Sequence, residues 1–355
     1  MEMRMKALIL IGGLGTRLRP LTCSMPKPLL PIVNRPFLEY QFKLLKKHGV
    51  KDVVLCVAYM SHEFEKQFGD GKRLGLNIKY VHEQDPLGTG GAVKNAEKYL
   101  DSTTVILNGD ILTDVDLKAM HKFHKANKAE VTIALTRVKD PTAFGLVETK
   151  KDGRIERFLE KPSWDEVTCN TINAGVYIFE PSVLNSIPPG INYSVERGLF
   201  PNLLRENRSI YGYTFKGYWM DIGTIEKYLQ AHFDMMLCNM DFQLPGRMKQ
   251  DNLWVGNNLK WGNNIELTGR LVCGNNTQVG DSAQIQGNVC VGNNVRIGKG
   301  CVITDSVILD NTQLGEGVRL ERVIIGKDCR IEANSILSPK TTLGNGTVIS
   351  KFSKL

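Results

Sequence analysis

A six-residue repeat in the last third of the chain restricts the fold more than any other feature of the sequence. An apolar residue recurs at every sixth position, and a glycine follows most of these residues. The recurring apolar residues are Val255, Trp261, Leu267, Cys273, Val279, Ile285, Val291, Ile297, Ile303 and Leu309. Up to Ile303, the glycine is missing only at Thr268, Gln286 and Thr304, and these exceptions lie 18 residues apart. Three six-residue sides form one coil of a triangular prism, so the sequence predicts a hexapeptide β-helix of about five coils over residues 246–355.

The repeat has a break in its spacing, and it contains no histidine. Its phase slips around Leu314 and Leu320, which predicts shortened corners, and it resumes at Ile325, Ile331, Leu337 and Leu343. Prisms of this kind also occur in acyltransferases, where a histidine commonly acts as general base. All the histidines of this chain precede the repeat: His48, His62, His82, His121, His124 and His232. The sequence therefore argues against an acyl-transferring site and favours self-association or regulation through coil edges that another subunit could cover.

The first two thirds of the chain alternate between buried strands and amphipathic helices. Strands are predicted at residues 7–11, 53–57, 78–81, 104–108, 131–136 and 211–215. Helices are predicted at residues 36–48, from 61, up to 99, at 117–126 and at 224–239, while residues 144–179 have a more irregular pattern. This alternation predicts an α/β domain with a Rossmann-like mixed or parallel sheet over residues 1–245. A length of 355 residues with 42% hydrophobic content also suits two domains.

A glycine- and arginine-rich loop follows the first predicted strand. We call residues 12–32, GGLGTRLRPLTCSMPKPLLPI, the signature segment. Its glycines let the backbone turn and bring amides to an anion, and its hydroxyl and guanidinium groups add hydrogen bonds and positive charge. These residues are Gly12, Gly13, Gly15, Thr16, Arg17 and Arg19. Lys27 stands between two prolines, whose rings limit where its ammonium can go. The segment matches neither the dinucleotide fingerprint nor the P-loop, so it predicts a phosphate site of another type.

Two further strand ends carry candidate ligands. Asp110 follows the predicted strand at 104–108, and an acid at the carboxyl end of a central strand is well placed to hold Mg²⁺, which takes one or two carboxylates. Asp114 and Asp116 are predicted as helix caps instead. A second glycine loop follows the strand at 78–81. Glu83 lies beside this loop.

The signature segment resembles the N-terminal signature of sugar-1-phosphate nucleotidyltransferases. In that family a GxGTRLxPLT segment, here Gly13 to Thr22, is followed by PKPLLP, here Pro26 to Pro31. Later family motifs occur in the same order across nearly all of the chain. The SVERGLFP segment that ends at Pro201 and the YWMDIGT segment that contains Asp221 are most similar to the mannose-1-phosphate guanylyltransferase branch. The resemblance also implies that the β-helix is left-handed.

The resemblance implies a reaction and a role for each motif. A phosphate oxygen of a hexose 1-phosphate attacks the α-phosphorus of a nucleoside triphosphate, and pyrophosphate leaves. Arg17 and the glycine amides would hold the leaving phosphates, Lys27 the transferring region and Lys161 the attacking phosphate. Mg²⁺ is expected on Asp110 and Asp221. Further nucleotide contacts are expected from Gly12, Gly13, Gly15, Thr16, Glu83, Leu87, Gly88, Thr89 and Asn108. The residues expected to face the sugar are Gly145, Glu160 and Asn173.

The net charge and the cysteine content indicate which binding partners and which cell compartment to expect. The formal net charge of +8 would attract nucleotides, phosphosugars and polynucleotides alike. No block of Lys or Arg marks a nucleic-acid tail, so we expect small anionic substrates and no nucleic acid. The eight cysteines form no Cys-x-x-Cys pair and are expected to be reduced and mostly buried. The N-terminal apolar run is too short for a signal peptide or a membrane span, which predicts a cytoplasmic protein without a membrane partner.

Two alternatives remain open on the sequence. The first is a thymidylyl-, uridylyl- or adenylyltransferase that acts on glucose 1-phosphate. Manno-configured heptose phosphates and other hexoses also remain open as the sugar, because pocket shape sets the stereochemistry at one carbon. The second is a non-catalytic regulatory subunit that binds a sugar nucleotide as a signal. The charged residues of the predicted site are all present, which favours an enzyme: Arg17, Lys27, Asp110, Lys161 and Asp221.

Overall fold

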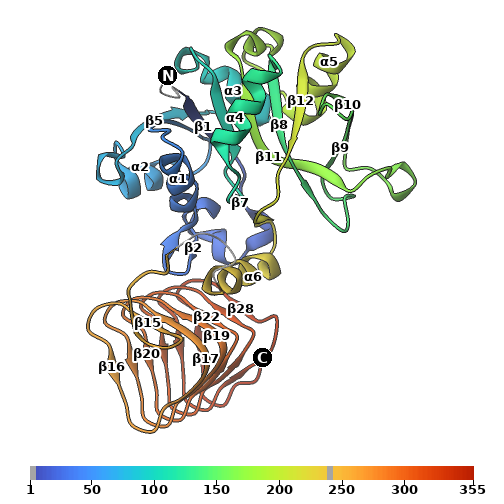
Figure 1. The fold of residues 1–355 in the computed structure, drawn as a ribbon. Helices are drawn as coiled ribbons and strands as arrows, with labels where there is room; N and C mark the ends of the chain where they lie inside the picture. Colours follow the sequence, from blue (N-terminus) through green and yellow to red (C-terminus); the bar gives the residue numbers. More distant parts are fainter. Residues whose placement is uncertain (1–4, 238–242) are drawn as a thin grey trace. The chain divides into compact units, whose positions relative to one another are not determined.

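The computed structural model describes residues 5–237 and 243–355 (Figure 1). The chain divides into two compact units, Met1–Gly13 with Tyr40–Trp219 and Leu14–Glu39 with Met220–Leu355. Most of the signature segment therefore belongs to the unit that contains the repeat. Each unit is described by itself below.

A nine-stranded mixed sheet lies at the centre of the first unit. The main path has the order β10-β9-β11-β6-β1-β4-β5, and β8 joins β11 to β12. β1 pairs in parallel with β4 and β6, whereas β11 runs antiparallel to β6. The predicted α/β fold with a mixed sheet is confirmed. The strands are β1 (Lys6–Ile11), β4 (Asp52–Val57), β5 (Asn77–His82), β6 (Thr104–Asn108), β8 (Val131–Arg137), β9 (Gly145–Thr149), β10 (Ile155–Glu160), β11 (Thr171–Phe179) and β12 (Ile210–Thr214).

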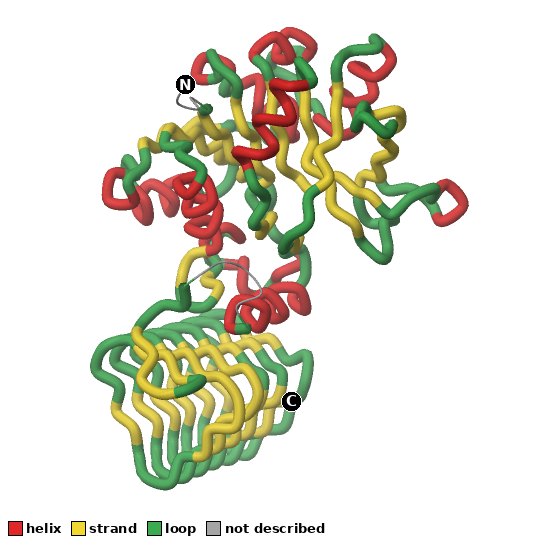
Figure 2. Tube along the Cα trace, viewed as in Figure 1, coloured by secondary structure: helices red, strands yellow, loops and turns green. Residues whose placement is uncertain are grey.

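The helices predicted at residues 36–48, from 61, at 117–126 and at 224–239 lie close to those positions (Figure 2). The helix predicted up to residue 99 ends at Asn95, and a further helix at residues 200–205 was not predicted. They are α1 (Phe37–Lys47), α2 (Ser61–Phe68), α3 (Gly88–Asn95), α4 (Leu117–Ala126), α5 (Phe200–Arg205) and α6 (Ile225–Met236). α1 is mostly buried, with exposed residues at Lys43, Lys46 and Lys47, and it stops before Gly49, which has a positive φ of 81°. Val93 of α3 and Phe200 of α5 share a core with Leu8 of β1, so these helices cover one face of the sheet. The last residues of the predicted helix at 224–239 lie outside the described residues.

Residues 144–179, which the sequence indicated as irregular, are instead largely strand. β9 and β10 form an antiparallel hairpin in which Val147 pairs with Phe158, and β11 follows. β10 has the burial pattern buried, exposed, half-buried, buried along IERF, so only part of one face is covered. Charged residues are common on such edge strands. They obscured the strand periodicity in the sequence.

The two predicted helix caps behave differently. Asp116 caps α4 as predicted, because its carboxylate accepts the N–H groups of Lys118 and Ala119 at 3.0 Å each. The prediction for Asp114 is wrong. Its Oδ1 accepts the backbone N–H of Tyr218 at 2.8 Å, and Asp114 donates its own N–H to the Tyr218 carbonyl at 3.2 Å. Asp114 therefore joins two segments that are far apart in the sequence, a role that local pattern does not reveal.

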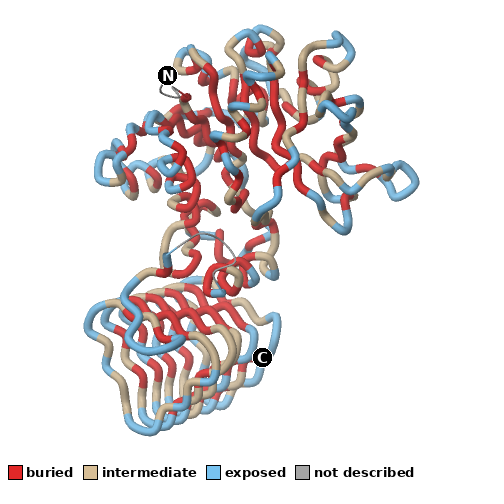
Figure 3. The backbone as a smooth tube through the Cα atoms, in the orientation of Figure 1, coloured by how far each residue is buried: buried red, intermediate tan, exposed pale blue. Residues whose placement is uncertain are grey.

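The repeat in the second unit forms stacked coils of short parallel strands. Val255 pairs with Cys273 and Cys273 with Val291, so one coil takes 18 residues, as predicted. Figure 3 shows rows of buried residues that run across successive coils. The strands are β14 (Arg247–Gln250), β15 (Leu253–Val255), β16 (Lys260–Trp261), β17 (Glu266–Cys273), β18 (Gln278–Val279), β19 (Gln284–Val291), β20 (Arg296–Ile297), β21 (Val302–Thr304), β22 (Val307–Ile308), β23 (Gln313–Leu314), β24 (Arg319–Glu321), β25 (Ile324–Ile325), β26 (Arg330–Ile331), β27 (Ile336–Leu337), β28 (Thr342–Leu343) and β29 (Val348–Ile349).

The predicted phase slip exists and begins earlier than the sequence indicated. Val291 pairs with Ile308 and Ile308 with Ile325, so each of these two successive coils takes 17 residues. Leu309 was predicted in this row and is replaced there by Ile308, although Leu309 is also buried. The shortened corners lie at Asp305 and Arg322, which have positive φ values of 45° and 47°. Ile325 then pairs with Leu343, which restores the 18-residue coil.

Asparagine ladders account for the polar content of the repeat. The side-chain amide of Asn258 donates to Asn276, which donates to Asn294, then to Asn311 and finally to Asp328, at 2.8–2.9 Å. Each of these residues has a positive φ, which asparagine and aspartate tolerate better than other side chains. The ladder therefore stabilises one corner of every coil.

The cysteines are mostly buried, as predicted, where the structure describes them. All cysteines in the described residues are free: Cys23 is exposed, Cys169 is half-buried, and Cys56, Cys273, Cys290, Cys301 and Cys329 are buried. Cys238 lies outside the described residues. Among the residues described, none of the helices combines the length and apolar character needed to cross a membrane.

Candidate active site

In the first unit, two neighbouring strand ends carry predicted site residues. Leu10 of β1 is the parallel partner of Asn108 of β6, so the residues that follow these strands lie at one edge of the sheet. Gly12 and Gly13 follow β1, and Asp110 follows β6. The structure thus brings these four predicted residues, Gly12, Gly13, Asn108 and Asp110, to the same edge.

Gln41 of α1 holds the turn that carries Asp110. Its amide donates to the Asn108 carbonyl at 2.8 Å and to the Ile111 carbonyl at 2.9 Å, one bond on each side of the aspartate. Gly109 donates to the Leu10 carbonyl at 2.9 Å, and a Cβ at Gly109 would come within 2.6 Å of that oxygen. The sequence interpretation missed Gln41, whose buried polar side chain in an apolar helix face was the available signal.

The part of the signature segment in the second unit folds back on itself. Gly15 has a positive φ of 63°, and the Thr22 hydroxyl donates to the Gly15 carbonyl at 2.8 Å. A Cβ at Gly15 would lie 3.1 Å from the Cβ of Lys27, so Lys27 packs directly against the glycine turn. Thr16 and Arg17 begin a short 3₁₀ helix immediately after Gly15. The structure therefore brings Lys27 next to the predicted phosphate loop.

Arg17 and Asp221 approach one glycine from the same side. A Cβ placed on Gly223 would meet a guanidinium nitrogen of Arg17 and Oδ2 of Asp221, each at 3.1 Å. Lys227 in the first turns of α6 lies 3.3 Å from Asp221 Oδ2. The cap Thr224 begins α6 by accepting the Lys227 N–H, which orients that turn toward Asp221. Lys227 was missed, although a lysine three residues after a cap and six after the predicted ligand could have suggested it.

The predicted base-binding loop is held by Glu83. Glu83 Oε2 accepts the Leu87 N–H at 3.0 Å, and burial raises the pKa of this carboxyl. Its Oε1 is buried without a hydrogen-bond partner among the described residues. Gly88 has a positive φ of 70°, and a Cβ there would lie 2.8 Å from the Tyr193 carbonyl. Glu83, Leu87 and Gly88 therefore form one compact turn with an unused acceptor oxygen.

The predicted sugar residues also lie close together. A Cβ at Gly145 would lie 3.0 Å from Glu160 Oε2, so the missing side chain leaves room for this carboxylate. Burial and the neighbouring charge of Glu196 raise the pKa of Glu160. Lys161 is exposed and has a positive φ of 55°, and its N–H donates to the Phe144 carbonyl at 2.9 Å. Such strained backbone persists only where its surroundings fix it, and it concentrates at functional sites.

A buried tyrosine joins the sugar residues to the base loop. Tyr177 is fully buried, and its hydroxyl accepts from the Asn173 amide at 2.9 Å and donates to Glu196 Oε1 at 3.2 Å. Glu196 Oε2 in turn accepts the hydroxyls of Thr89 at 2.7 Å and Ser194 at 2.9 Å. Burial raises the pKa of the Tyr177 phenol well above its usual value, so it stays a donor. The network thus connects Thr89, predicted for the nucleotide, with Asn173, predicted for the sugar.

The sequence interpretation missed Tyr177 and Glu196. Glu196 belongs to the SVERGLFP segment, which served only to choose a family branch. A tyrosine among apolar strand residues gave no sign of a polar partner. Both roles depend on contacts between β11, α3 and the residues around 195, which no local pattern contains.

We expect Tyr177→Phe to destabilise the protein by about 1–3 kcal/mol, because it leaves an amide and a carboxylate oxygen buried without their partner. Differential scanning calorimetry would measure the fall in Tm. Tyr213→Phe is the matched control, since Tyr213 of β12 is half-buried in the same sheet. Equal Tm values for the two variants would contradict a central role for the Tyr177 hydroxyl.

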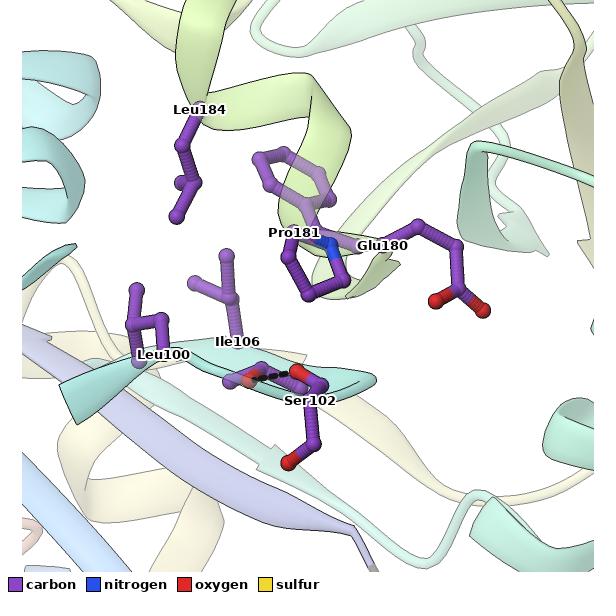
Figure 4. Close-up of a pocket in the computed structure, with 8 residues that line it drawn as sticks. Leu100, Ser102, Ile106, Glu180, Pro181 and Leu184 are labelled. Atoms are coloured by element: carbon purple, nitrogen blue, oxygen red, sulfur yellow. Dashed lines mark hydrogen bonds between the residues drawn. The ribbon is translucent and has the colours of Figure 1, made fainter. Parts of the chain in front are cut away.

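A hollow at the opposite end of the sheet contains none of the predicted site residues (Figure 4). It has about 180 Å³ of empty volume, open solvent included, between the start of β6 and the end of β11. Leu100, Ile106 and Leu184 give it an apolar lining, and Glu180 at its rim is held by His124 and Thr103 at 3.0 Å. Ligands of α/β sheets bind at the carboxyl ends of the parallel strands. The hollow lies at the other end and is a feature of core packing.

Comparisons with known proteins cover both parts of the chain. A family described as "Nucleotidyl transferase" matches residues 6–236, and one described as "GMPPB C-terminal domain" matches residues 267–353. A mannose-1-phosphate guanylyltransferase of Mycobacterium tuberculosis is 45% identical over 232 residues, which is 65% of this chain and 64% of that protein. The chain thus spans slightly less than two thirds of that relative.

Other relatives are matched over more of their length. The mannose-1-phosphate guanylyltransferase catalytic subunit beta of Danio rerio is 40% identical over 72% of this chain and 71% of its own. A UTP–glucose-1-phosphate uridylyltransferase of Synechocystis is 34% identical over 92% and 88%, respectively. Among solved structures, HddC from Yersinia pseudotuberculosis complexed with GMP-PN has a TM-score of 0.56 at 28% identity and covers 65% of this chain and 100% of its own.

Proposed function

We propose a reaction for this chain from the premise that it belongs to the nucleotidyl transferase family. The chain would transfer a nucleoside monophosphate from a nucleoside triphosphate to a hexose 1-phosphate and release pyrophosphate. GTP and mannose 1-phosphate are the proposed preferred substrates. The observation that carries the proposal is the folded signature segment, in which Lys27 packs against the turn at Gly15 and Arg17 lies with Asp221 beside Gly223. Two of the relatives above carry the matching name.

The proposed chemistry is an in-line attack that needs no covalent protein intermediate. The protein's contribution is to position two polyanions and to offset charge that develops on the α-phosphoryl and leaving groups. Arg17 and the backbone amides of Gly12, Gly13, Gly15 and Thr16 would bind the leaving β- and γ-phosphates. Lys27 would bind the transferring phosphoryl group and Lys161 the attacking phosphate. Gly145, Glu160 and Asn173 would face the sugar hydroxyls.

The donor set fits Mg²⁺, for which Asp110 and Asp221 are the proposed ligands. Mg²⁺ takes one or two carboxylates and completes its shell with phosphates and waters. Two residues before Asp110, the Oδ1 of Asn108 is buried and has no hydrogen-bond partner among the residues that the structure describes. When bound, the ion would supply charge neutralisation at the phosphates.

Glu83 is proposed to select guanine. A carboxylate with one oxygen fixed by the Leu87 N–H and one oxygen unpartnered can accept from the N1–H and N2 amine of that base. Leu87, Gly88 and Thr89 would lie along the base. Burial raises the pKa of Glu83, and hydrogen-bond donors on a bound base would favour its charged form.

We expect Glu83→Gln to raise the KM for GTP about 10-fold, because it removes a charged acceptor from a buried site. The KM for mannose 1-phosphate should stay near the wild-type value. Glu97→Gln, at a partly exposed carboxylate that pairs with Lys94, is the matched control. An unchanged preference for GTP over UTP in the Glu83 variant would reject its role in base selection.

Pyrophosphate release from a panel of triphosphates crossed with sugar 1-phosphates tests the proposed function. The expected result is the highest kcat/KM for GTP with mannose 1-phosphate. A uridylyltransferase acting on glucose 1-phosphate is the second candidate, which the long match to the Synechocystis protein favours. Highest activity with UTP and glucose 1-phosphate would establish that alternative. No release with any pair would indicate a regulatory subunit that binds sugar nucleotide without turnover.

The proposal extends to domains and setting. Residues 1–245 would form the transferase domain and residues 246–355 the repeat domain, through which the protein would form a homo-oligomer. A cytoplasmic location is proposed on the free cysteines of the described residues.

A further inference from the structure

The hairpin that ends the signature segment has an unusual turn. β2 (Pro31–Ile32) pairs antiparallel with β3 (Arg35–Pro36), and two residues with positive φ join them, Val33 at 43° and Asn34 at 60°. We call residues 31–36 the anchor hairpin. Two-residue hairpin turns require positive φ and favour Asn and Gly, whereas a β-branched valine there is an outlier. Val33 is fully buried, so surrounding contacts must fix this conformation.

α6 binds one side of the anchor hairpin. The Val33 N–H donates to His232 Nδ1 at 3.2 Å, and the Tyr228 hydroxyl donates to the Pro31 carbonyl. The two aromatic rings pack edge to face, with centroids 4.9 Å apart. Full burial lowers the pKa of His232 to about 3, so its ring is neutral and Nδ1 is available as an acceptor. α6 thus holds the strained turn through two buried side chains.

The β-helix binds the other side of the anchor hairpin. The Asn34 amide donates to the Val291 carbonyl at 2.8 Å, and the Cys290 thiol donates to Asn34 Oδ1 at 3.6 Å. Val291 and Cys290 end the long strand β19, whose backbone is paired with β17 and β22. Asn34 therefore attaches the hairpin to a rigid part of the repeat.

A second attachment lies near the middle of the signature segment. The Asn345 amide donates to the Ser24 hydroxyl at 2.9 Å. A Cβ at Gly344 would lie 3.1 Å from the Cβ of Pro20, so the late coil also touches the backbone turn before Ser24. Lys27 lies between this attachment and the anchor hairpin. The β-helix thus holds the segment that carries Lys27 at both ends.

We propose that the β-helix takes part in catalysis by holding the signature segment in its working conformation, and that Asn34 is a positioning residue for this purpose. The inference rests on the proposed function, since the segment matters for turnover only if Arg17 and Lys27 bind the triphosphate. Displacement of charged groups by about 1 Å can lower the rate about 100-fold. A side chain outside the phosphate site can therefore control the reaction through the backbone that it fixes.

Asn34→Gly is the decisive substitution. Glycine keeps the positive φ without steric cost and deletes both side-chain bonds to the β-helix. We expect kcat/KM for the triphosphate to fall about 10-fold, with a raised KM for the triphosphate and an unchanged KM for the sugar 1-phosphate. Asn34→Asp, which preserves shape and cannot donate to the Val291 carbonyl, should behave similarly. Asn264→Gly is the matched control, because Asn264 is an exposed residue of the repeat with a φ of 55°.

The kinetic pattern separates positioning from a merely structural role. A structural role would lower Tm and the active fraction, so kcat would fall while both KM values stayed constant, and this result would overturn the proposal. Hydrogen–deuterium exchange provides a second measurement, in which amides of residues 14–39 should exchange faster in Asn34→Gly than in Asn264→Gly. If the wild type is active and Asn34→Gly has unchanged kinetics and unchanged exchange, this inference would be overturned and the proposed function would stand. A wild type without activity on any substrate pair would overturn the proposed function and this inference with it.

Discussion

Asp110→Asn should lower the rate of pyrophosphate release at least about 100-fold while the protein stays folded. Asparagine keeps the size of the side chain and removes the negative charge that the proposed Mg²⁺ site requires. The fold should tolerate the change, because Gln41 holds the turn through the backbone carbonyls of Asn108 and Ile111. Steady-state release of pyrophosphate and thermal unfolding, measured on the same preparation, would test both parts.

Asp101→Asn provides the matched control for this result. Asp101 precedes β6, where it pairs with Lys6, whereas Asp110 follows the same strand at its carboxyl end. Both substitutions remove one carboxylate next to one strand, and only the loss at position 110 should stop turnover. Raising the Mg²⁺ concentration should recover part of the activity of an Asp221→Asn variant, if that residue contributes one of two ligands. Near-normal turnover by Asp110→Asn would remove this residue from the metal site.

Periodicity and strand ends were the features that the sequence made visible. The 18-residue coil follows from a repeat that every coil obeys, so the spacing of apolar residues alone aligns Val255, Cys273 and Val291. The place of Asp110 followed from a buried apolar run that ends at Asn108. In both cases the information is local, because hydrophobic spacing reports directly on which residues face a core.

The features that the sequence did not reveal depend on pairs of distant residues. Tyr177 and Glu196 acquire their roles only when β11 packs against the residues around 195. Asp114 looks like a helix cap and instead binds the backbone of Tyr218. The β9–β10 hairpin was obscured because edge strands carry charge on their uncovered positions. Such partners are set by tertiary packing, which overrides local propensity.

The division of the chain into two units shows which motifs belong to the same compact unit, and the order of the motifs in the sequence does not show this. The signature segment precedes most of the sheet strands in sequence, yet from Leu14 to Glu39 it belongs to the same compact unit as the repeat. Arg17 and Asp221, 204 residues apart, face one glycine within that unit. A change in the repeat that disturbs Val291 should therefore affect the loop with Lys27 more than the sheet with Asp110.

Lys27→Ala should reduce kcat/KM for the triphosphate on the order of 100-fold, because it removes a cation held against the phosphate loop. The structure gives a reason for the size of the effect. Pro26 and Pro28 flank Lys27, and its Cβ packs 3.1 Å from where a Cβ of Gly15 would lie, so the ammonium has few alternative positions. A cation fixed in this way needs little reorganisation when charge develops.

Lys27→Arg separates charge from placement. Arginine keeps the positive charge but replaces the compact ammonium with a planar guanidinium. Its hydrogen bonds to phosphate therefore have a different geometry. We expect Lys27→Arg to recover less than about one tenth of the lost activity, measured as pyrophosphate release at saturating sugar 1-phosphate. Lys66→Ala on α2 is the control for removal of a surface lysine. If Lys27→Ala matched that control in kcat/KM, the signature segment would bind phosphate through Arg17 and the backbone amides alone, and the lysine between two prolines would serve only to shape the turn.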